Sequence, residues 1–141
     1  MDIRELETDA AILEAYPLMK VLRERITRDT FLDEVRRQQA CGYRLLAAYE
    51  HGKPIVLAGI RRAHTLSRGD HLFVDDLVTD EATRAAGHGR AMMQFLAREA
   101  ADHGIPRIYL DARITAKGFY EKLGFTFLTS IPCWIDVERL S

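Results

Sequence analysis

The sequence is poor in cysteine and in long apolar runs. Of its 141 residues only Cys41 and Cys133 are cysteines, and without a secretory context we expect both thiols to be free and partly buried. No run approaches the ~18 consecutive apolar residues that a membrane-spanning helix needs. The first residues, MDIRELETDAAILEA, carry acids and lack the apolar core of a secretory signal. We therefore expect a cytoplasmic protein with no membrane association.

The sequence also lacks a strong net charge. Its formal charge is -1 at pH 7, and the basic residues are scattered as singles and pairs, so we expect no nucleic-acid partner. The five histidines show no metal-ligand spacing, which predicts no metal site. No Gly-Lys-Ser/Thr triplet occurs, and this excludes the phosphate loop of nucleotide triphosphatases.

What remains is typical of an ordinary globular protein. Hydrophobic residues make up 48% and charged residues 29% of the chain. A chain of this length buries roughly 68 to 70% of its unfolded surface, which is enough for one self-sufficient core. We predict a single domain over residues 1–141.

The most informative stretch runs from His71 to Gly104. An apolar, β-branched run at 72–78 predicts a strand, and it contains two adjacent carboxylates, Asp75 and Asp76. A glycine-bearing loop follows, and then apolar residues recur at helical spacing at Met92, Phe95, Leu96 and Ala100. The order predicted is a strand, a glycine loop and an amphipathic helix that Gly104 ends.

This order predicts a diphosphate site where the helix begins. The first amides of a helix have no internal partner, and the helix dipole places partial positive charge there. Gly87 and Gly89 let the backbone approach a ligand closely. A dinucleotide fingerprint would need a glycine where Met92 stands. The alternative is that the two glycines only shape a turn.

Two motifs resemble those of the GNAT N-acetyltransferases. Arg84-x-x-Gly87-x-Gly89 is similar to the family's acetyl-coenzyme A motif, Gln/Arg-x-x-Gly-x-Gly/Ala. Further along, Leu110-Asp111-Ala112, Ala116 and then Phe119-Tyr120-Glu121-Lys122-Leu123-Gly124-Phe125 resemble its later strand and helix motif. The two motifs occur in the family's order and at its spacing, and the resemblance is motif-specific over about 73–125.

The resemblance implies an α/β (α+β) GNAT fold. That fold is a single mixed, mostly antiparallel sheet of six to seven strands with a splayed central parallel pair, flanked by about four helices. Apolar runs at 43–50 and 54–63, joined by a short glycine turn, predict an antiparallel hairpin. We expect a bulge or a close approach at Gly59, a parallel strand at 107–111, and final strands at 125–128 and 134–139.

The resemblance also implies acetyl-coenzyme A as cosubstrate and no metal. We expect the main chain of Leu77, Val78 and Thr79 to pair with the pantetheine arm. The diphosphate would be held by the loop and helix start, through Arg84, Ala85, Ala86, Gly87, His88, Gly89 and Arg90. Many relatives have an asparagine before the downstream helix, whereas this sequence has Arg113 and Thr115 in that region as candidate replacements.

Asp75 and Asp76 are the candidate bases for such a transfer. A free alkyl amine titrates near ~10.4, so a carboxylate or an ordered water must take its proton. Asp75 occupies the position where the resemblance places a glutamate, and we hypothesise that it collects the proton through water, ahead of Asp76. Neighbouring strand side chains face opposite ways, so we expect only one of the two to face the cleft. Alternatively, both are solvated or pair with arginines.

Tyr120 is the candidate acid. A phenol titrates near ~10 and a thiol near ~8.5, so a neutral tyrosine can give a proton to a departing thiolate. The resemblance places this tyrosine beside the coenzyme sulfur. The alternative is a core aromatic next to Phe119.

These features predict an N-acetyltransferase that moves an acetyl group from acetyl-coenzyme A directly to a primary amine in a ternary complex. The alternative is a non-catalytic acyl-coenzyme A binding or sensing module of the same fold. The acceptor is a small-molecule or peptide amine: a metabolite, an antibiotic, a lysine side chain or a protein N-terminus. The acidic pair weakly favours a cationic acceptor, and analogy with the family allows a homodimer through the last strands or the sheet edge.

Overall fold

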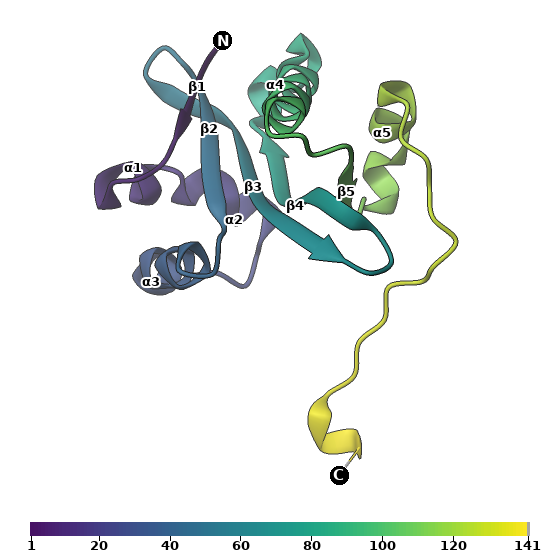
Figure 1. Ribbon diagram of the computed structural model, residues 1–141. Coiled ribbons are helices and arrows are strands. Elements are labelled where there is room, and N and C mark those ends of the chain that lie inside the picture. Colours follow the sequence, from purple (N-terminus) through teal and green to yellow (C-terminus); the bar gives the residue numbers. More distant parts are fainter. Residues whose placement is uncertain (141) are drawn as a thin grey trace. The chain divides into compact units, whose positions relative to one another are not determined.

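The computed structural model describes the backbone of residues 1–140 and every side chain among them except that of Ala85. The chain forms two compact units, which meet between Asp111 and Ala112. The first unit contains the whole β-sheet and the helices that cover it (Figure 1). The second contains one short α-helix and the C-terminal segment.

The sheet of the first unit has five strands in the order β1-β2-β3-β4-β5 among the described residues. Their bounds are β1 Asp2–Glu5, β2 Arg44–Glu50, β3 Lys53–Thr65, β4 Gly69–Thr79 and β5 Ile108–Leu110. The pairs β1–β2, β2–β3 and β3–β4 are antiparallel, and β5 is parallel to β4. The predicted mixed sheet with one parallel pair is confirmed, although it has five strands rather than six to seven.

The turn between β2 and β3 has the geometry that its residues favour. His51 and Gly52 both have positive φ, at 53° and 73°, and Glu50 pairs with Lys53 across the turn. Positive φ at both central residues is the type I′ arrangement, whose twist matches that of the strands it joins. The hairpin predicted at this point is confirmed.

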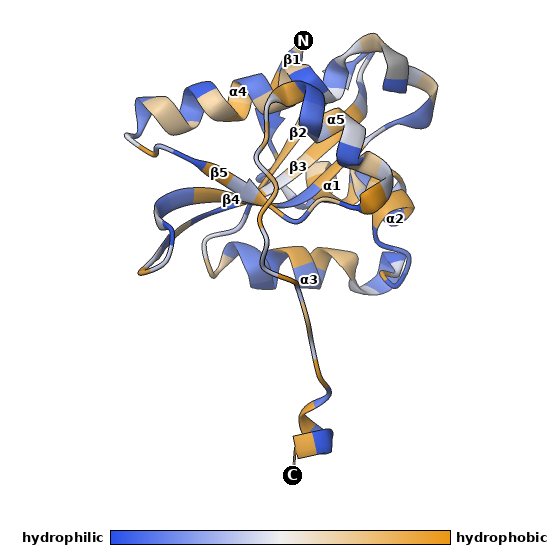
Figure 2. Ribbon diagram, turned by 90° about the vertical axis from the view of Figure 1, so that its right-hand side faces the viewer, coloured by the Kyte–Doolittle hydropathy of each residue, from blue (hydrophilic) through white to orange (hydrophobic). Residues whose placement is uncertain are grey.

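Helices cover both faces of the sheet. Figure 2 shows α3 and α4 on opposite sides of it. The bounds are α1 Asp9–Glu14, α2 Tyr16–Leu22, α3 Arg28–Gln39 and α4 His88–Asp102. Pro17 lies in the first turn of α2, where its missing N–H costs no hydrogen bond, and it separates α2 from α1.

Because both faces are covered, the central strands are buried on both sides. Leu45–Tyr49 of β2 is a continuous buried run, as is Ile55–Ile60 of β3. One apolar cluster lies between the sheet and the first three helices; its helix members include Ile12, Met19, Phe31 and Val35, and its strand members include Leu45, Leu57 and Val78. Through Val78, this core fixes the position of β4 against the first three helices.

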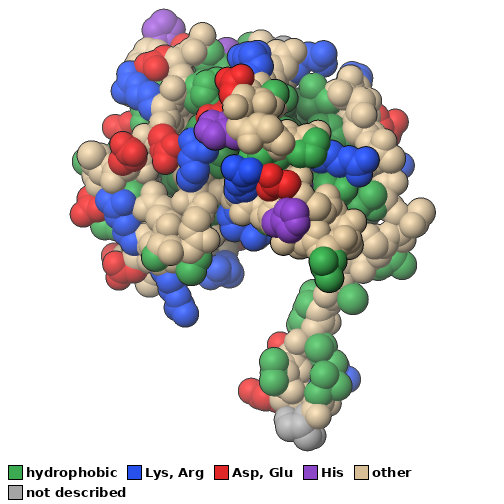
Figure 3. Space-filling model, viewed as in Figure 1, with side chains coloured by type: hydrophobic (Ala, Val, Ile, Leu, Met, Phe, Trp, Pro, Cys, Tyr) green, Lys and Arg blue, Asp and Glu red, His purple; other side chains and the backbone are tan. Residues whose placement is uncertain are grey.

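The second unit contains η2 Ile114–Ala116, α5 Lys117–Leu123 and η3 Val137–Leu140. Gly124, at φ 91°, ends α5. The predicted strands at 125–128 and 134–139 are wrong: 125–136 has no regular structure, and η3 takes the place of the last strand. A β-strand must pair its backbone N–H and C=O groups with those of an adjacent strand, and Pro132 has no N–H to donate. Figure 3 shows apolar side chains on the surface of this segment. Ile131 and Trp134 are among its exposed apolar residues.

Both cysteines are free, but neither is partly buried as expected. Cys41 and Cys133 are exposed, because Cys41 lies in the turn after α3 and Cys133 in the irregular C-terminal segment. No helix within residues 1–140 is long and apolar enough to cross a membrane. No group of three or more His, Cys, Asp or Glu side chains in the described part of the chain is arranged to hold a metal ion.

Candidate active site

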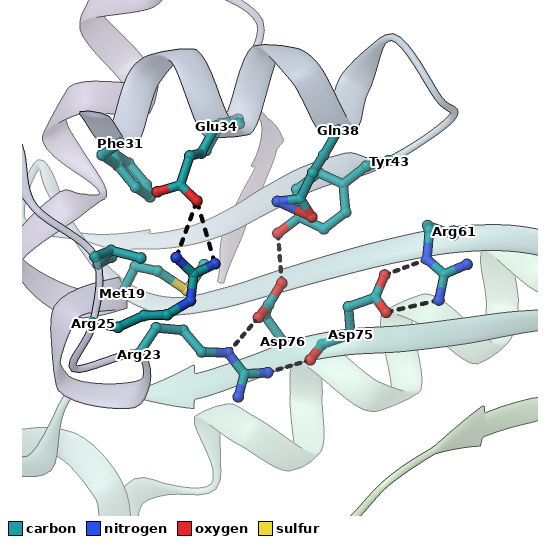
Figure 4. A pocket seen from close by; sticks show the side chains of 12 residues that line it. Met19, Arg23, Arg25, Phe31, Glu34, Gln38, Tyr43, Arg61, Asp75 and Asp76 are labelled. Carbon is teal, nitrogen blue, oxygen red and sulfur yellow. Dashed lines mark hydrogen bonds and ion pairs between the residues drawn. The ribbon is translucent and has the colours of Figure 1, made fainter. Parts of the chain in front are cut away.

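The two carboxylates of β4 lie on the same side of the sheet. Across the β3–β4 ladder Gly59 pairs with Asp76 and Ile60 with Val74, so the register shifts and Asp75 is the extra residue of a bulge. The bulge breaks the two-residue alternation of the strand. Asp75 and Asp76 therefore line the same pocket (Figure 4), and the prediction that only one of them faces the cleft is wrong.

Asp76 is fixed by two donors from distant parts of the chain. The Tyr43 hydroxyl donates to its Oδ2 at 2.7 Å, and Arg23 Nε donates to its Oδ1 at 2.8 Å. Burial raises the pKa of the Tyr43 phenol, and the negative charge of Asp76 raises it further. Tyr43 therefore stays neutral and remains a donor to Asp76 throughout the physiological pH range.

Asp75 forms a two-point ion pair with Arg61. Arg61 Nε and Nη2 donate to the two carboxylate oxygens at 2.6 and 2.8 Å, and the same guanidinium lies 5.3 Å from the centre of the Phe73 ring. Arg23 Nη2 donates to the Asp75 main-chain oxygen at 2.6 Å. Each carboxylate is therefore paired with an arginine, as one of the alternatives proposed.

Gly59 is required by the close approach of Tyr43 and Asp76. A Cβ at position 59 would lie 1.9 Å from the Tyr43 hydroxyl oxygen and 2.6 Å from Asp76 Oδ2. Any side chain there would break the hydrogen bond between these two groups. The bulge and close approach expected at Gly59 are both confirmed.

We expect Gly59→Ala to destabilise the fold by about 1–3 kcal/mol, the usual cost of forcing extra volume into a packed site. Urea unfolding followed by circular dichroism measures the change. Gly118→Ala is the matched control, because a Cβ at Gly118 in α5 meets no atom within 4 Å. A Gly59→Ala variant as stable as the control would contradict this account of the Tyr43–Asp76 contact.

The end of β4 offers a free backbone edge. β5 pairs with β4 only at Leu72, Phe73 and Val74, so β4 has no strand neighbour on that side from Asp75 to Thr79 among the described residues. On its other side the same segment continues to pair with β3. The splay places Leu77, Val78 and Thr79, the predicted pantetheine-binding residues, along this open edge.

The first backbone amides of the helix that follows β4 have no intrahelical partner. The first intrahelical bond of α4 runs from Ala91 N–H to Gly87 C=O, and no side chain caps the helix. Gly87 links η1 Glu81–Ala86 to α4 with φ 80°, a conformation that L-residues other than glycine rarely adopt. The amides of His88, Gly89 and Arg90 are thus available to an anion.

The side chains around this helix start are mostly cationic. Arg84 and Arg90 are exposed, and neither forms an ion pair or a hydrogen bond through its side chain within the described part of the chain. His88 Nε2 lies 3.4 Å from Glu50 Oε2, which is a contact that the sequence did not indicate. Ala85 and Ala86 lie in η1, with the side chain of Ala85 outside the described part.

Asp80 fixes the exit from β4. Its Oδ1 accepts the Ala82 N–H at 3.1 Å, its own N–H donates to Ile55 C=O at 2.7 Å, and Lys53 lies 3.3 Å from Oδ2. The backbone bond from Ala82 is the main cause of a lowered Asp80 pKa. An aspartate just before a helical turn is a recognised capping signal.

Tyr120 belongs to α5 of the second unit. Its ring makes edge-to-face contacts with Phe119 and Phe125, at centroid distances of 5.0 and 5.2 Å. The ring is buried, which raises the phenol pKa. No buried polar side-chain atom lacks a partner in the described part of the chain, and no hydrogen bond of the Tyr120 hydroxyl is found there, so its oxygen is accessible to solvent. Tyr120 is therefore a protonated donor at neutral pH.

The pocket in front of the acidic pair has a volume of about 280 Å³. Apolar side chains of α2 and α3 form one wall, and charged and polar side chains form most of the rest (Figure 4). Sequence analysis missed Arg23, Arg61 and Tyr43 as parts of this site. Their partners on β4 are up to 53 positions away along the chain, so no local pattern marked them.

The open edge of β4 leads to an uncapped, glycine-led helix start, and a pocket lined by two carboxylates of β4 lies on the same strand. The sequence matches the Acetyltransferase (GNAT) family over residues 4–125. The chain belongs to this family, and the protein is an N-acetyltransferase-type enzyme.

Known proteins of similar sequence and structure agree with this assignment. An uncharacterized N-acetyltransferase of Bacillus subtilis, YhdJ, is 30% identical over 132 residues, covering 88% of this chain and 91% of that protein. The glucosamine 6-phosphate N-acetyltransferase of Trypanosoma brucei brucei is 27% identical, covering 85% and 79%. The solved structure of the aminoglycoside N-acetyltransferase AAC(6')-Iy in complex with CoA is 17% identical, with a TM-score of 0.82 and coverage of 96% and 94%; this last likeness concerns the fold.

Proposed function

We propose that this protein transfers the acetyl group of acetyl-coenzyme A directly to a primary amine held in the pocket beside Asp75 and Asp76, with both substrates bound at once. The uncapped start of α4, which follows the open edge of β4, is the observation that carries the proposal. The family match runs from the first unit into the second. This supports residues 1–141 acting as one domain.

The residues at these elements fit coenzyme A. The free backbone groups of Leu77, Val78 and Thr79 suit an amide-bearing arm laid alongside β4. The amides from Ala85 to Arg90 suit a diphosphate, and Arg84 and Arg90 add positive charge where that charge is needed. A side chain at Gly87 would both strain the backbone and crowd the anion.

When bound, acetyl-coenzyme A supplies an activated acetyl group and a thiol leaving group. The amine must first lose a proton, because its ammonium form has no free electron pair. We assign that proton to Asp75 through water. Within the described part of the chain the Asp75 carboxylate pairs only with the half-exposed Arg61, whereas Asp76 is anchored by both Arg23 and Tyr43. We therefore assign Asp76 a structural role, in which it holds Arg23 and Tyr43 in place in the pocket wall.

Tyr120 gives its proton to the departing thiolate. A phenol whose pKa burial has raised keeps its proton at neutral pH and has it ready for the sulfur. A main-chain amide at or near Leu77 polarises the thioester carbonyl, which stabilises developing negative charge without a dedicated side chain.

We expect Asp75→Asn to lower kcat/KM by about 10- to 100-fold at neutral pH, within the range of a lost general base, and to remove the acidic limb of its pH profile. Asp76→Asn should instead weaken two charge-assisted hydrogen bonds and lower the free energy of unfolding by about 1–3 kcal/mol. Steady-state kinetics from pH 5 to 9 and urea unfolding separate the two effects. An unchanged pH profile in the Asp75→Asn enzyme would remove this residue as the base.

Release of free thiol from acetyl-coenzyme A in the presence of a panel of primary amines tests the proposed function. We expect thiol release to depend on the amine and to yield an equal amount of acetylated product by mass spectrometry. Thiol release that is independent of every amine would contradict the proposal.

A further inference from the structure

The pocket in front of Asp75 and Asp76 is lined by three ion pairs. Arg23 pairs with Asp76, Arg61 with Asp75, and Arg25 with Glu34 (Figure 4). These three arginines and three acids are the only charged residues that line the pocket within the described part of the chain. The formal charge of its wall is therefore zero, and the acids offer no excess negative charge to a cation.

The arginines keep unused hydrogen-bond donors. Arg61 uses Nε and Nη2 on Asp75, and Arg23 uses Nε and Nη2 on Asp76 and Asp75 of β4. Among the described residues, the Nη1 group of each arginine therefore has no acceptor. Arg25 reaches a single oxygen of Glu34 at 3.2 Å from both Nη1 and Nη2, with its side chain 80% exposed. An exposed pair of this kind contributes little, so Arg25 can exchange Glu34 for an anion of a ligand.

This arrangement disfavours a purely cationic acceptor. A polycation would bring further positive charge next to three guanidinium groups whose acid partners are already neutralised. An amine that carries its own carboxylate or phosphate would place its ammonium by the acids and its anion by the arginines, whose planar forks bind both anions well. The pocket volume of about 280 Å³ lies at the small end of ligand sites.

Resting on the proposed acetyl transfer, we infer that the acceptor is a small amine that also bears a carboxylate or phosphate group, and that Arg25 binds this anionic group. Arg25 lies in the loop after α2, opposite α3, where Glu34 holds it across the pocket from β4 (Figure 4). The carbon body of the acceptor would contact the apolar wall formed by Met19, Phe31 and Val35. Arg25 is a specificity residue in this scheme.

Two pairs of amines that differ in one anionic group test this inference. Glucosamine 6-phosphate is compared with glucosamine, and phenylalanine with phenylalaninamide; spermidine serves as a polycation. We expect kcat/KM to favour the anionic member of at least one pair by about 10- to 100-fold, the effect of one or two hydrogen bonds to a charged group. The pair that shows the preference identifies phosphate or carboxylate as the anion.

Two variants locate the preference. Arg25→Gln should reduce that ratio to near one, mainly through KM of the anionic acceptor. Arg37→Gln removes the same charge from an exposed position of α3 that does not line the pocket, and it should leave the ratio unchanged. A ratio that survives Arg25→Gln would overturn the role of this residue.

Equal kcat/KM within both pairs, or a preference for spermidine, would overturn the inference about the acceptor while leaving acetyl transfer in place. Turnover with none of these amines would overturn it as well. Calorimetry with coenzyme A distinguishes that last case from failure of the proposed function, because a protein that still binds the coenzyme retains the site at α4.

Discussion

Replacing Tyr120 by phenylalanine is expected to lower kcat by about 100-fold or more, within the 10²–10⁴ range of a positioned acid. The substitution removes one hydroxyl and keeps the ring that packs against Phe119 and Phe125. The fold and the affinity for coenzyme A should therefore change little. Pre-steady-state kinetics of thiol release, together with calorimetric titration of coenzyme A, measures both quantities.

Tyr49→Phe is the matched control for this experiment. Tyr49 lies on β2, its ring is buried, and burial raises its pKa as it does for Tyr120. It does not line the pocket, so its loss should leave kcat unaltered. Turnover by Tyr120→Phe equal to that of Tyr49→Phe would leave Tyr120 as a core aromatic with no catalytic role.

Gly87→Asp is expected to weaken coenzyme A binding by about 100-fold, which is the effect of one or two lost charge-assisted hydrogen bonds. The new carboxylate would lie at the N-terminus of α4, where it competes for the same free amides and repels the diphosphate. Aspartate tolerates the left-handed backbone better than most residues, and its charge favours the helix start. Calorimetry at low salt gives the affinity.

Gly87→Asn separates charge from shape. Asparagine has nearly the same volume as aspartate and also tolerates positive φ, but it brings no negative charge. We expect its affinity for coenzyme A to lie between those of the Gly87→Asp variant and the unmodified protein, and the gap between the two variants to shrink as salt is added. Equal affinities in the two variants would show that charge at this helix start has no influence on binding.

The central element could be predicted from the sequence because its signals are local. Gly87, the residues before it and the apolar spacing that follows all lie within one short stretch, and each sets the backbone around itself. The hairpin at His51 and Gly52 was predictable for the same reason, since positive φ at two adjacent residues is a property of the turn alone.

The arrangement of the acidic pair could not be predicted in this way. The alternation rule places Asp75 and Asp76 on opposite faces, and the bulge in the β3–β4 ladder brings both to one side. Gly59 indicated a bulge at this point of the sheet. No feature of the sequence indicated which residues would pair with the two carboxylates. Tyr43 is 33 residues from Asp76, and Arg23 is 53 residues away from it.

In the C-terminal segment the prediction failed although the local signals for strands were present. Its apolar and β-branched residues have strand propensity, but propensity describes how a residue fits a sheet that already offers an edge. The strands predicted at 125–128 and 134–139 have no strand partner among the described residues. Trp134, the first residue of the second predicted strand, is 86% exposed.

The central claim is that the free amides at the start of α4 bind a diphosphate, and parallel calorimetric titrations with coenzyme A and with pantetheine test it most directly. Pantetheine keeps the arm that would lie along β4 and lacks the diphosphate together with the adenosine 3′-phosphate attached to it. We predict micromolar binding of coenzyme A and binding of pantetheine that is weaker by about 100-fold or more. Equal affinities for the two compounds, or no heat from coenzyme A, would contradict the claim.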